Sequence, residues 1–255
     1  MALLTKAQLI QQGVYYTPTA QQTVAAGATG TFTFQGYNAQ LYGLNRILPR
    51  LGSGNPYDFL VTAKILYSQG PTTLFENVSM DAVQNLFSAR SLRGALFIEE
   101  QTELEIDVQN TSAADAVVNV ELLGYAATQL EQVQQQYALQ NKPFPRPLFI
   151  SAPNTSIAAG ATSSIVSVTL PKQRLRLYRM AMGSDSPASL SLKIRQNTVY
   201  IKPQVLVSQI TDEFKYMDII LPIELDSRIP FRLYVDNLDT VNAHNLSFLA
   251  ETYMV

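Results

Sequence analysis

The sequence predicts an all-β protein built from two tandem sandwiches or barrels, and two observations lead to that fold class. Short segments with alternating polar and apolar residues recur along the chain, separated by turns rich in Gly, Pro, Asn and Ser. A domain-sized internal repeat divides these segments into two similar sets. Short strands at this spacing favour a sandwich or barrel over a parallel sheet with crossover helices.

Two pairs of matching segments carry the internal repeat. The segment 24–29 (VAAGAT) returns as 157–162 (IAAGAT), and the segment 108–110 (VQN) returns as 235–237 (VDN). The second pair is spaced slightly more closely than the first. Insertions and deletions in loops account for a small difference of this kind. We therefore expect one duplicated unit of about 100–120 residues, the size of a domain.

Strands are expected in both units, with few helices. The candidate strands are 31–34, 41–48, 58–67, 72–78, 95–99, 103–108 and 117–125 in the first unit, and 163–170, 174–182, 189–195, 198–207, 218–224, 231–235 and 245–253 in the second. Helical spacing is found at 2–12 and 126–140, and more weakly at 80–89, with a helical turn at 210–216.

These elements divide the chain into four parts. We expect an N-terminal arm or helix at 1–19, a first sandwich at 20–125, a helix and Pro-rich linker at 126–150, and a second sandwich at 151–255. The linker is expected to be stiff and extended because it contains three prolines within 143–147.

The composition indicates a large folded core with few charges. Of the 255 residues, 47% are hydrophobic and 15% are charged, whereas an average soluble domain has about 25% charged residues. These values exclude a disordered chain, and no apolar run approaches the ~20 residues of a membrane span. The absence of cysteine excludes disulfide scaffolds and thiol catalysis. The start of the chain lacks the pattern of a secretory signal.

The low charge content also bears on the partners of the protein. The net charge of −2 provides no general attraction to nucleic acid or to anionic lipid, so no specific nucleic-acid binding is expected. The polar residues are mainly Gln, Asn, Ser and Thr. Contact surfaces between subunits are depleted in charge, because an ion removed from water must be paired. The composition therefore favours a protein that assembles with copies of itself.

The residues available for catalysis are few. His244 is the single histidine, which excludes a two-histidine zinc site, and its polar loop favours a solvated or interfacial role over general base catalysis. No phosphate-binding loop and no nucleophile elbow are present. We expect no catalytic residue, no cofactor, no metal site and no small-molecule substrate.

Carboxylates gather before and along one candidate strand. Because side chains alternate along a strand, those at 103, 105 and 107 are expected to form a solvated sheet face. A salt-bridge surface between subunits and a metal or catalytic site are the alternatives. The carboxylates are Glu99, Glu100, Glu103, Glu105 and Asp107.

Basic residues gather in the second unit, and apolar residues near the N-terminus. The basic group is expected to be a solvated strand face, with pairing to a neighbour's carboxylates as the next interpretation and nucleic-acid contact as the last. The apolar N-terminal residues are expected to pack on a neighbouring subunit rather than on a membrane. The basic residues are Lys172, Arg174, Arg176 and Arg179, and the apolar ones are Leu3, Leu4, Ala7, Leu9 and Ile10.

Two tandem eight-stranded β-sandwiches, joined by a helix and a Pro-rich connector, resemble the double jelly-roll major capsid proteins of the lineage that includes tailless membrane-containing bacteriophages and adenovirus. The resemblance covers about residues 20–255 and rests on architecture and on the two repeated segments. The chain is near the small end for such proteins, which implies short loops.

The resemblance implies a fold of two tandem jelly rolls and a structural role without enzymatic activity. It also implies a homotrimer with a nearly hexagonal outline that contacts neighbouring trimers and tiles an icosahedral shell. The expected location is the virion, after assembly in the host cytoplasm. Other virion proteins and an internal lipid membrane are further possible partners. A virion decoration, spike or baseplate protein and a tandem jelly-roll carbohydrate-binding protein remain the alternatives.

Overall fold

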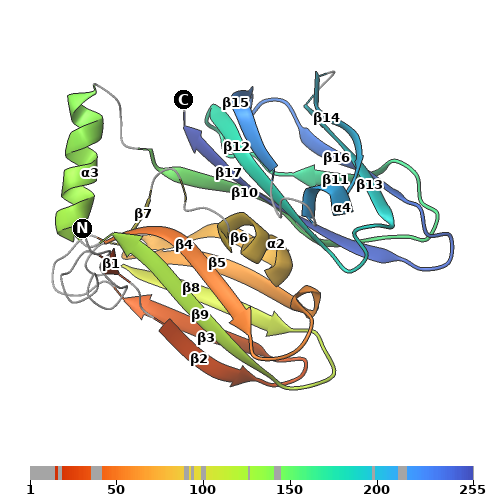
Figure 1. Cartoon of the computed structure of the whole chain (residues 1–255), viewed down its shortest axis with the longest axis horizontal. Coiled ribbons are helices and arrows are strands. Elements are labelled where there is room, and N and C mark those ends of the chain that lie inside the picture. The colour runs from red at the N-terminus through yellow and green to blue at the C-terminus, as the bar shows by residue number, and fades with distance from the viewer. Residues whose placement is uncertain are drawn as a thin grey trace, which may run out of the picture.

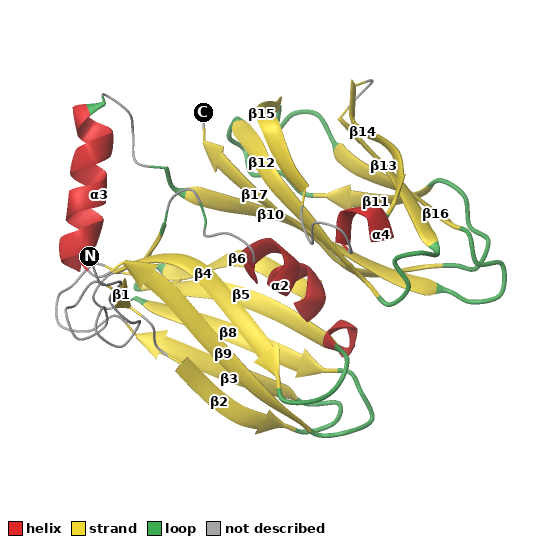
Figure 2. Cartoon of the chain, in the orientation of Figure 1, coloured by secondary structure: helices red, strands yellow, loops and turns green. Residues whose placement is uncertain are grey.

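A computed structural model shows two β-sandwiches with one α-helix between them (Figure 1). It describes residues 15–16, 19–35, 42–88, 92, 95–98, 102–125, 127–140, 145–196, 199–211 and 217–254. Strands dominate both halves (Figure 2). The helix expected at 2–12 lies outside the described residues.

The first sandwich consists of two antiparallel sheets. One has the order β2-β9-β4-β7, with the short β1 also paired to β9, and the other has the order β3-β8-β5-β6. A 3-10 turn, η1 (Pro56–Asp58), precedes β5, and α2 (Met80–Ser88) connects β6 to β7. The strands are β1 (Tyr15–Tyr16), β2 (Thr19–Val24), β3 (Thr29–Gln35), β4 (Tyr42–Leu51), β5 (Phe59–Tyr67), β6 (Gly70–Ser79), β7 (Leu96–Ile98), β8 (Glu103–Asn110) and β9 (Ala116–Tyr125).

The second sandwich repeats this arrangement. Its sheets have the orders β10-β17-β12-β15 and β11-β16-β13-β14. The helical turn α4 (Ser208–Thr211) connects β14 to β15, where the first sandwich has α2. The strands are β10 (Pro147–Ile157), β11 (Ser164–Val168), β12 (Leu175–Ser184), β13 (Leu190–Gln196), β14 (Val199–Leu206), β15 (Met217–Leu225), β16 (Phe231–Asn237) and β17 (His244–Met254).

The strand orders identify both sandwiches as jelly rolls. Numbering β2–β9 and β10–β17 each from one to eight gives the same two sheets, 1-8-3-6 and 2-7-4-5. This is the order of an eight-stranded double Greek key. The predicted fold class, two tandem eight-stranded jelly rolls, is therefore confirmed.

The two halves also match in strand register. The ladder of β4 with β9 is irregular between Leu44 and Arg46, and that of β12 with β17 between Leu177 and Arg179. The spacing between these two irregularities is the same as the spacing between the repeated VAAGAT and IAAGAT segments. A bulge displaces all later side chains along a strand, so its retention preserves the alignment of both sheets.

The repeated segments meet in the structure and form the same hydrogen-bonded turn twice. Asn110 ends β8, and its Nδ2 donates to the carbonyls of Val24 (3.1 Å) and Ala114 (2.8 Å). Asn237 ends β16, and its Nδ2 donates to the carbonyls of Ile157 (3.1 Å) and Asn242 (2.9 Å), among others. These bonds fix the loop between the first two strands of each sandwich against its seventh strand.

The backbone of this turn explains the glycine in both segments. The φ angles of Gly27 and Gly160 are 71° and 61°, in the left-handed region that residues with a Cβ rarely adopt. The carbonyl of the alanine that follows each glycine accepts a hydrogen bond from the backbone amide of the asparagine, at 2.9 Å from Asn110 and 2.8 Å from Asn237. The repeat is thus retained where backbone geometry requires it.

Each sandwich has its own apolar core between its sheets. Alternation along the strands supplies it, as in β8, where every second residue from Leu104 to Val108 is buried. Phe59 and Phe75 are large core residues of the first sandwich, and Phe231 and Phe248 of the second.

The structure contains a first strand in each sandwich, β2 and β10, that the sequence pattern does not predict. β2 is largely polar and exposed until Val24, so its alternation is weak. β10 begins at Pro147, inside the segment expected to be a linker, and contains an irregularity between Ala152 and Thr155. The helix expected at 126–140 is found as α3 (Ala127–Leu139), which stands at one end of the molecule (Figure 1).

Replacing Asn110 or Asn237 by alanine is predicted to lower the free energy of unfolding by about 2 kcal/mol, because the carbonyl of Val24 or of Ile157 loses a buried hydrogen-bond donor. Denaturant unfolding followed by circular dichroism measures this loss. Gln109→Ala, an exposed neighbour on β8, is the control and should change little. Equal stability of the asparagine variants and the parent would contradict the role given to this turn.

Candidate functional site

The contact between the two sandwiches is the most elaborate polar and apolar site among the described residues. The helix α2 of the first sandwich lies against β12 and β17 of the second, and β6 lies against β10 (Figure 1). The sheet β10-β17-β12 therefore has its inner face on its own core and its outer face on the first sandwich. This part of the sheet is covered on both sides.

A glycine allows α2 to approach this sheet closely. A Cβ atom at Gly183 would lie 2.0 Å from Ser79 Oγ and 2.9 Å from the amide nitrogen of Ala82. Beside it, the hydroxyls of Ser79 and Ser247 share a buried hydrogen bond of 2.6 Å. Asn85 Nδ2 donates to the carbonyl of Met182 (3.1 Å). The helix is thus held to the sheet by short polar contacts where the two backbones are nearest.

A buried ion pair lies at the end of α2. Arg179 Nε donates to Glu251 Oε2 (2.9 Å), and a second donor, Nη2, bonds to the same oxygen. Arg179 Nη1 donates to the carbonyl of Leu86 (2.9 Å), and Tyr253 Oη donates to the other Glu251 oxygen. The side chains of Arg179 and Glu251 are 3% and 1% exposed. Because both charges are removed from water, each needs the other and these additional bonds.

Apolar side chains complete the contact. Ala181 and Leu249 of the second sandwich are fully buried in the core cluster of the first. The ring of Phe149 lies 5.8 Å from the rings of both Phe75 and Phe87, edge-on to the former. Continuity of one apolar cluster across the contact makes the two sandwiches a single packed unit.

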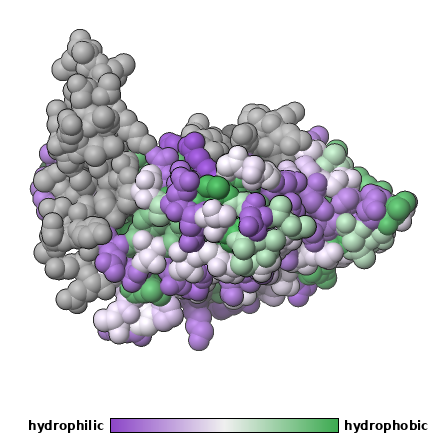
Figure 3. Space-filling view, turned by 90° about the horizontal axis from the view of Figure 1, so that it is seen from below, coloured by the Kyte–Doolittle hydropathy of each residue, from purple (hydrophilic) through white to green (hydrophobic). Residues whose placement is uncertain are grey.

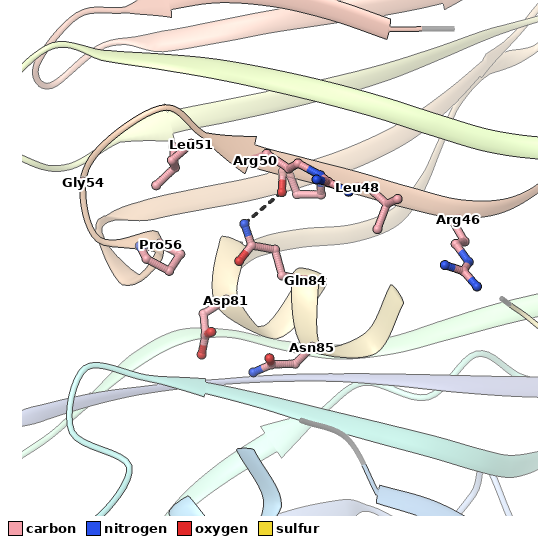
Figure 4. Close-up of a pocket in the computed structure, with 10 residues that line it drawn as sticks. Arg46, Leu48, Arg50, Leu51, Gly54, Pro56, Asp81, Gln84 and Asn85 are labelled. Atoms are coloured by element: carbon pink, nitrogen blue, oxygen red, sulfur yellow. Dashed lines mark hydrogen bonds between the residues drawn. The ribbon is translucent and has the colours of Figure 1, made fainter. Parts of the chain in front are cut away.

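A hollow of about 510 Å³ lies beside this contact, between α2 and β4. Figure 4 shows Gln84 pointing from α2 to β4, where its Nε2 donates to the carbonyl of Pro49 (2.8 Å). Arg46 and Arg50 from the strand and Asp81 from the helix add charged groups of both signs. The lining is therefore polar and mixed in sign, and the hollow borders the outer face of β4.

The structure places the predicted carboxylates on the outer face of the first sandwich. Lys64 Nζ lies 2.9 Å from Asp107 Oδ2 and 3.3 Å from Glu105 Oε1, and its hydrogen bonds to these carboxylates raise the pKa of Lys64. Thr31 donates its hydroxyl to Asp107 (2.7 Å). Glu103 lies on the same face. The residues Glu99 and Glu100 lie outside the described part of the chain.

The predicted basic residues do not share one environment. Lys172 and Arg174 are exposed, and Arg176 pairs with Glu224 (2.9 Å) at the surface, which raises the pKa of Arg176. The expectation of a solvated strand face does not hold for Arg179, which points from the same strand into the contact with α2. The bulge between Leu177 and Arg179 puts Arg179 on the same outer face as Arg176, and α2 covers this face at Arg179.

His244 lies at the start of β17 within a network of carboxylates and amides. Its Nε2 is 3.1 Å from Asp239 Oδ2, and its Nδ1 is 3.5 Å from Asp185 Oδ2. Asp239 also accepts bonds from the backbone of Val241 and from Asn242, and these bonds hold its pKa well below the ordinary value. The aspartate thus organises the loop between β16 and β17.

Exposed apolar side chains are found on the second sandwich. Leu238 and Val241, in the loop between β16 and β17, are 56% and 80% exposed, and Ile165 on β11 is 54% exposed. Figure 3 shows hydrophobic surface at the far tip of the molecule and mixed polar and apolar surface along its length. Single exposed apolar residues of this kind are common on protein surfaces.

The described residues offer neither a metal-binding cluster nor a membrane-spanning helix. Among them, no three histidine, cysteine or acidic residues are grouped in a way suited to hold a metal ion. Within the same ranges, no helix has the length and apolarity needed to cross a membrane.

Comparisons with known proteins assign neither a family nor a function to the chain. No protein-family model and no curated protein matches the chain. Among solved structures, the chain is similar to the major capsid protein P2 from bacteriophage PM2, with 13% identity, a TM-score of 0.42, and coverage of 93% of this chain and 98% of that one. It is also similar to the CBM22-1-CBM22-2 tandem domain of Paenibacillus barcinonensis Xyn10C, with 11% identity, a TM-score of 0.22, and coverage of 95% and 94%. At such values neither likeness establishes a family or transfers a function.

Replacing Arg179 by methionine is predicted to lower the free energy of unfolding by about 3–5 kcal/mol, because Glu251 is left as an unpaired buried charge. The double variant Arg179→Met with Glu251→Leu should recover most of this loss. Calorimetry or denaturant unfolding measures both.

The matched control for this prediction is Arg176→Ala on the same strand, whose exposed ion pair should contribute little. A single variant as stable as the parent, or a double variant worse than the single one, would show that the ion pair does not hold the contact.

Proposed function

We propose that this protein is a structural virion protein, a major capsid protein whose homotrimers tile an icosahedral shell. One observation carries the proposal. The sheet face that the second sandwich buries against α2 exists at the matching position of the first sandwich, where Arg50 is exposed and Leu48 and Asn119 are partly exposed, although α2 and α3 also contact β4. In the proposed trimer, the second sandwich of a neighbouring copy covers this face of the first sandwich.

The matching of positions follows from the strand ladders. The shared irregularity aligns Leu44 on β4 with Leu177 on β12, and their partners in the ladders align Gly124 on β9 with Thr252 on β17. Counting along the strands from these points relates each buried outer-face residue to a residue of the first sandwich. Ala181, Gly183, Ser247 and Leu249 correspond to Leu48, Arg50, Asn119 and Glu121, in that order.

The matching face of the first sandwich is more polar than its buried counterpart. Arg50 is exposed and lies 3.9 Å from Glu121. Leu48 and Asn119 are half-buried, and Asn119 Oδ1 is shielded from solvent without a hydrogen-bond partner. Interfaces that form between folded molecules are more polar than cores, whereas the internal contact resembles a core. This chemistry suits a contact that forms after the chain has folded.

A contact of this kind repeats head to tail. Each copy offers the outer face of β9 and β4 to one neighbour and the α4 side of its second sandwich to another, which is a heterologous interface. Such interfaces close into rings when the rotation per copy divides a full turn. Three copies with two sandwiches each form a ring of six similar units, and six similar edges allow contact with six neighbours. The trimer is the proposed building block of the shell.

The proposal extends to location and partners. A shell protein is located in the virion. Its expected partners are neighbouring trimers, other virion proteins and an internal lipid layer. Assembly of a shell from subunit contacts requires no chemical reaction, and we propose no enzymatic activity for the protein.

Sedimentation analysis and native mass spectrometry test the proposal. We predict a species of three times the 28.2 kDa chain mass, which the substitution Arg50→Glu converts to monomer because a second carboxylate then lies beside Glu121 in the contact. Lys172→Glu, an equal charge reversal at another exposed site, should leave the trimer intact. A parent protein that stays monomeric at high concentration would contradict the proposal.

A further inference from the structure

The outer sheets of the two sandwiches carry opposite charges. In the first sandwich, the strands β3, β8 and β5 contain Glu103, Glu105 and Asp107 and a single cation, Lys64. The residues that alternate with these carboxylates along β8 belong to the core, so the carboxylates face outward. This acidic face consists of Glu103, Glu105, Asp107 and Lys64.

The corresponding strands of the second sandwich have the reverse balance. β11, β16 and β13 contain Lys193, Arg195 and Arg232 and a single carboxylate, Asp236. Alternation with buried leucine and isoleucine residues of β13 and β16 turns these side chains outward. This basic face consists of Lys193, Arg195, Arg232 and Asp236.

The sign of the charge is reversed at one equivalent position, Glu105 and Arg232. Glu105 precedes Asn110 on β8 by as many positions as Arg232 precedes Asn237 on β16, and the two asparagines are equivalent residues of the repeat. In the ladders, Glu105 lies opposite Lys64, and Arg232 lies opposite Arg195. One ancestral sheet face has therefore become two faces of opposite sign in a single chain.

The basic face contains a hollow that suits a carboxylate. The hollow has a volume of about 260 Å³ and is lined by Arg195, Arg232 and Tyr234, with Ile229 and Pro230 at its side. The guanidinium of Arg195 lies 5.6 Å from the centre of the Tyr234 ring, which orients it. Two guanidinium groups at the border of one hollow are suited to bidentate recognition of carboxylates.

The acidic face is organised to present its charge. Lys64 lies between Glu105 and Asp107 and holds them in place. Glu103 lies at the end of this row, opposite Gln35 and Leu66 in the ladders, without a cation directly across. The face therefore keeps an excess of negative charge at a fixed position.

We propose that the acidic face of one copy docks on the basic face of a second copy. The occupant is a second copy because the same chain carries both complementary faces, whereas a net charge of −2 gives it no general attraction to polyanions. The two charged faces lie on the strands β3-β8-β5 and β11-β16-β13, whereas the contact proposed for the trimer uses the outer face of β9 and β4 and the α4 side of the second sandwich. The docking thus joins copies in addition to the trimer contact.

This contact should depend strongly on salt. Exposed charges separated by more than a Debye length are screened, and that length is ~8 Å at physiological ionic strength and ~3 Å at 1 M. Raising the salt concentration should therefore dissociate the docked faces at a concentration that leaves the less charged trimer contact, and the buried contact between the two sandwiches, intact.

A charge-swap experiment tests the proposal. The variant Glu103→Lys with Glu105→Lys has two basic faces, and Lys193→Glu with Arg232→Glu has two acidic faces. Each variant alone should lose self-association beyond the trimer at low salt, and an equimolar mixture should regain it, with binding at least about tenfold tighter than for either variant with itself. Surface-immobilised binding between purified variants, at low and high salt, measures this difference.

The control for charge alone is Lys172→Glu with Arg174→Glu, which makes the same change in net charge as the second variant at exposed sites outside both faces. It should self-associate like the parent, and thermal unfolding checks that every variant is folded. Variants that each associate like the parent, or a mixture that fails to bind, overturn the proposal.

Measuring the mass of each variant before mixing distinguishes a failure of the face-to-face docking from a failure of the proposed trimer. Trimeric variants that do not bind one another when mixed refute the face-to-face docking alone. Monomeric variants that bind only each other support the docking and refute the trimer.

Discussion

The contact between α2 and the β10-β17-β12 sheet constrains the whole molecule. A sandwich has two outer sheet faces, and here the outer face of one sheet is closed by the preceding sandwich through Gly183, Ser247 and the Arg179–Glu251 pair. The buried ion pair fixes the angle at which the helix ends on the sheet, since Arg179 also holds the carbonyl of Leu86. Two similar sandwiches are thereby packed into one block with distinct faces.

Because the sandwich is duplicated, the face that the chain buries in one sandwich has a counterpart in the other. A jelly roll copied in tandem has the same faces twice, but the chain can join them only once. The face on β9 and β4 retains the strand register of its buried counterpart while carrying polar residues such as Arg50 and Asn119. The charges of the outer sheets have diverged in the same way, with a reversal of sign at the matched position of Glu105 and Arg232. We infer that divergence after duplication has produced surfaces for specific contact between copies.

The fold is predictable from the sequence where local patterns reflect backbone geometry. The glycine and asparagine of the repeat are retained because a left-handed turn and a buried hydrogen-bond network require them, so they mark both units. The strands β2 and β10 escape the pattern because one is mostly polar and the other begins with a proline after a proline-rich segment. The contact site is not predictable in this way, since Ser79 is distant in the chain from Ser247 and Glu251, and Arg179 changes face at a bulge.

A reconstruction of the native assembly shows directly what surrounds the outer face of β9 and β4. We predict threefold symmetry, with Arg50 and Asn119 of each copy covered by the α4 side of a neighbour's second sandwich. An assembly that leaves this face in solvent, or that lacks threefold symmetry, would contradict it.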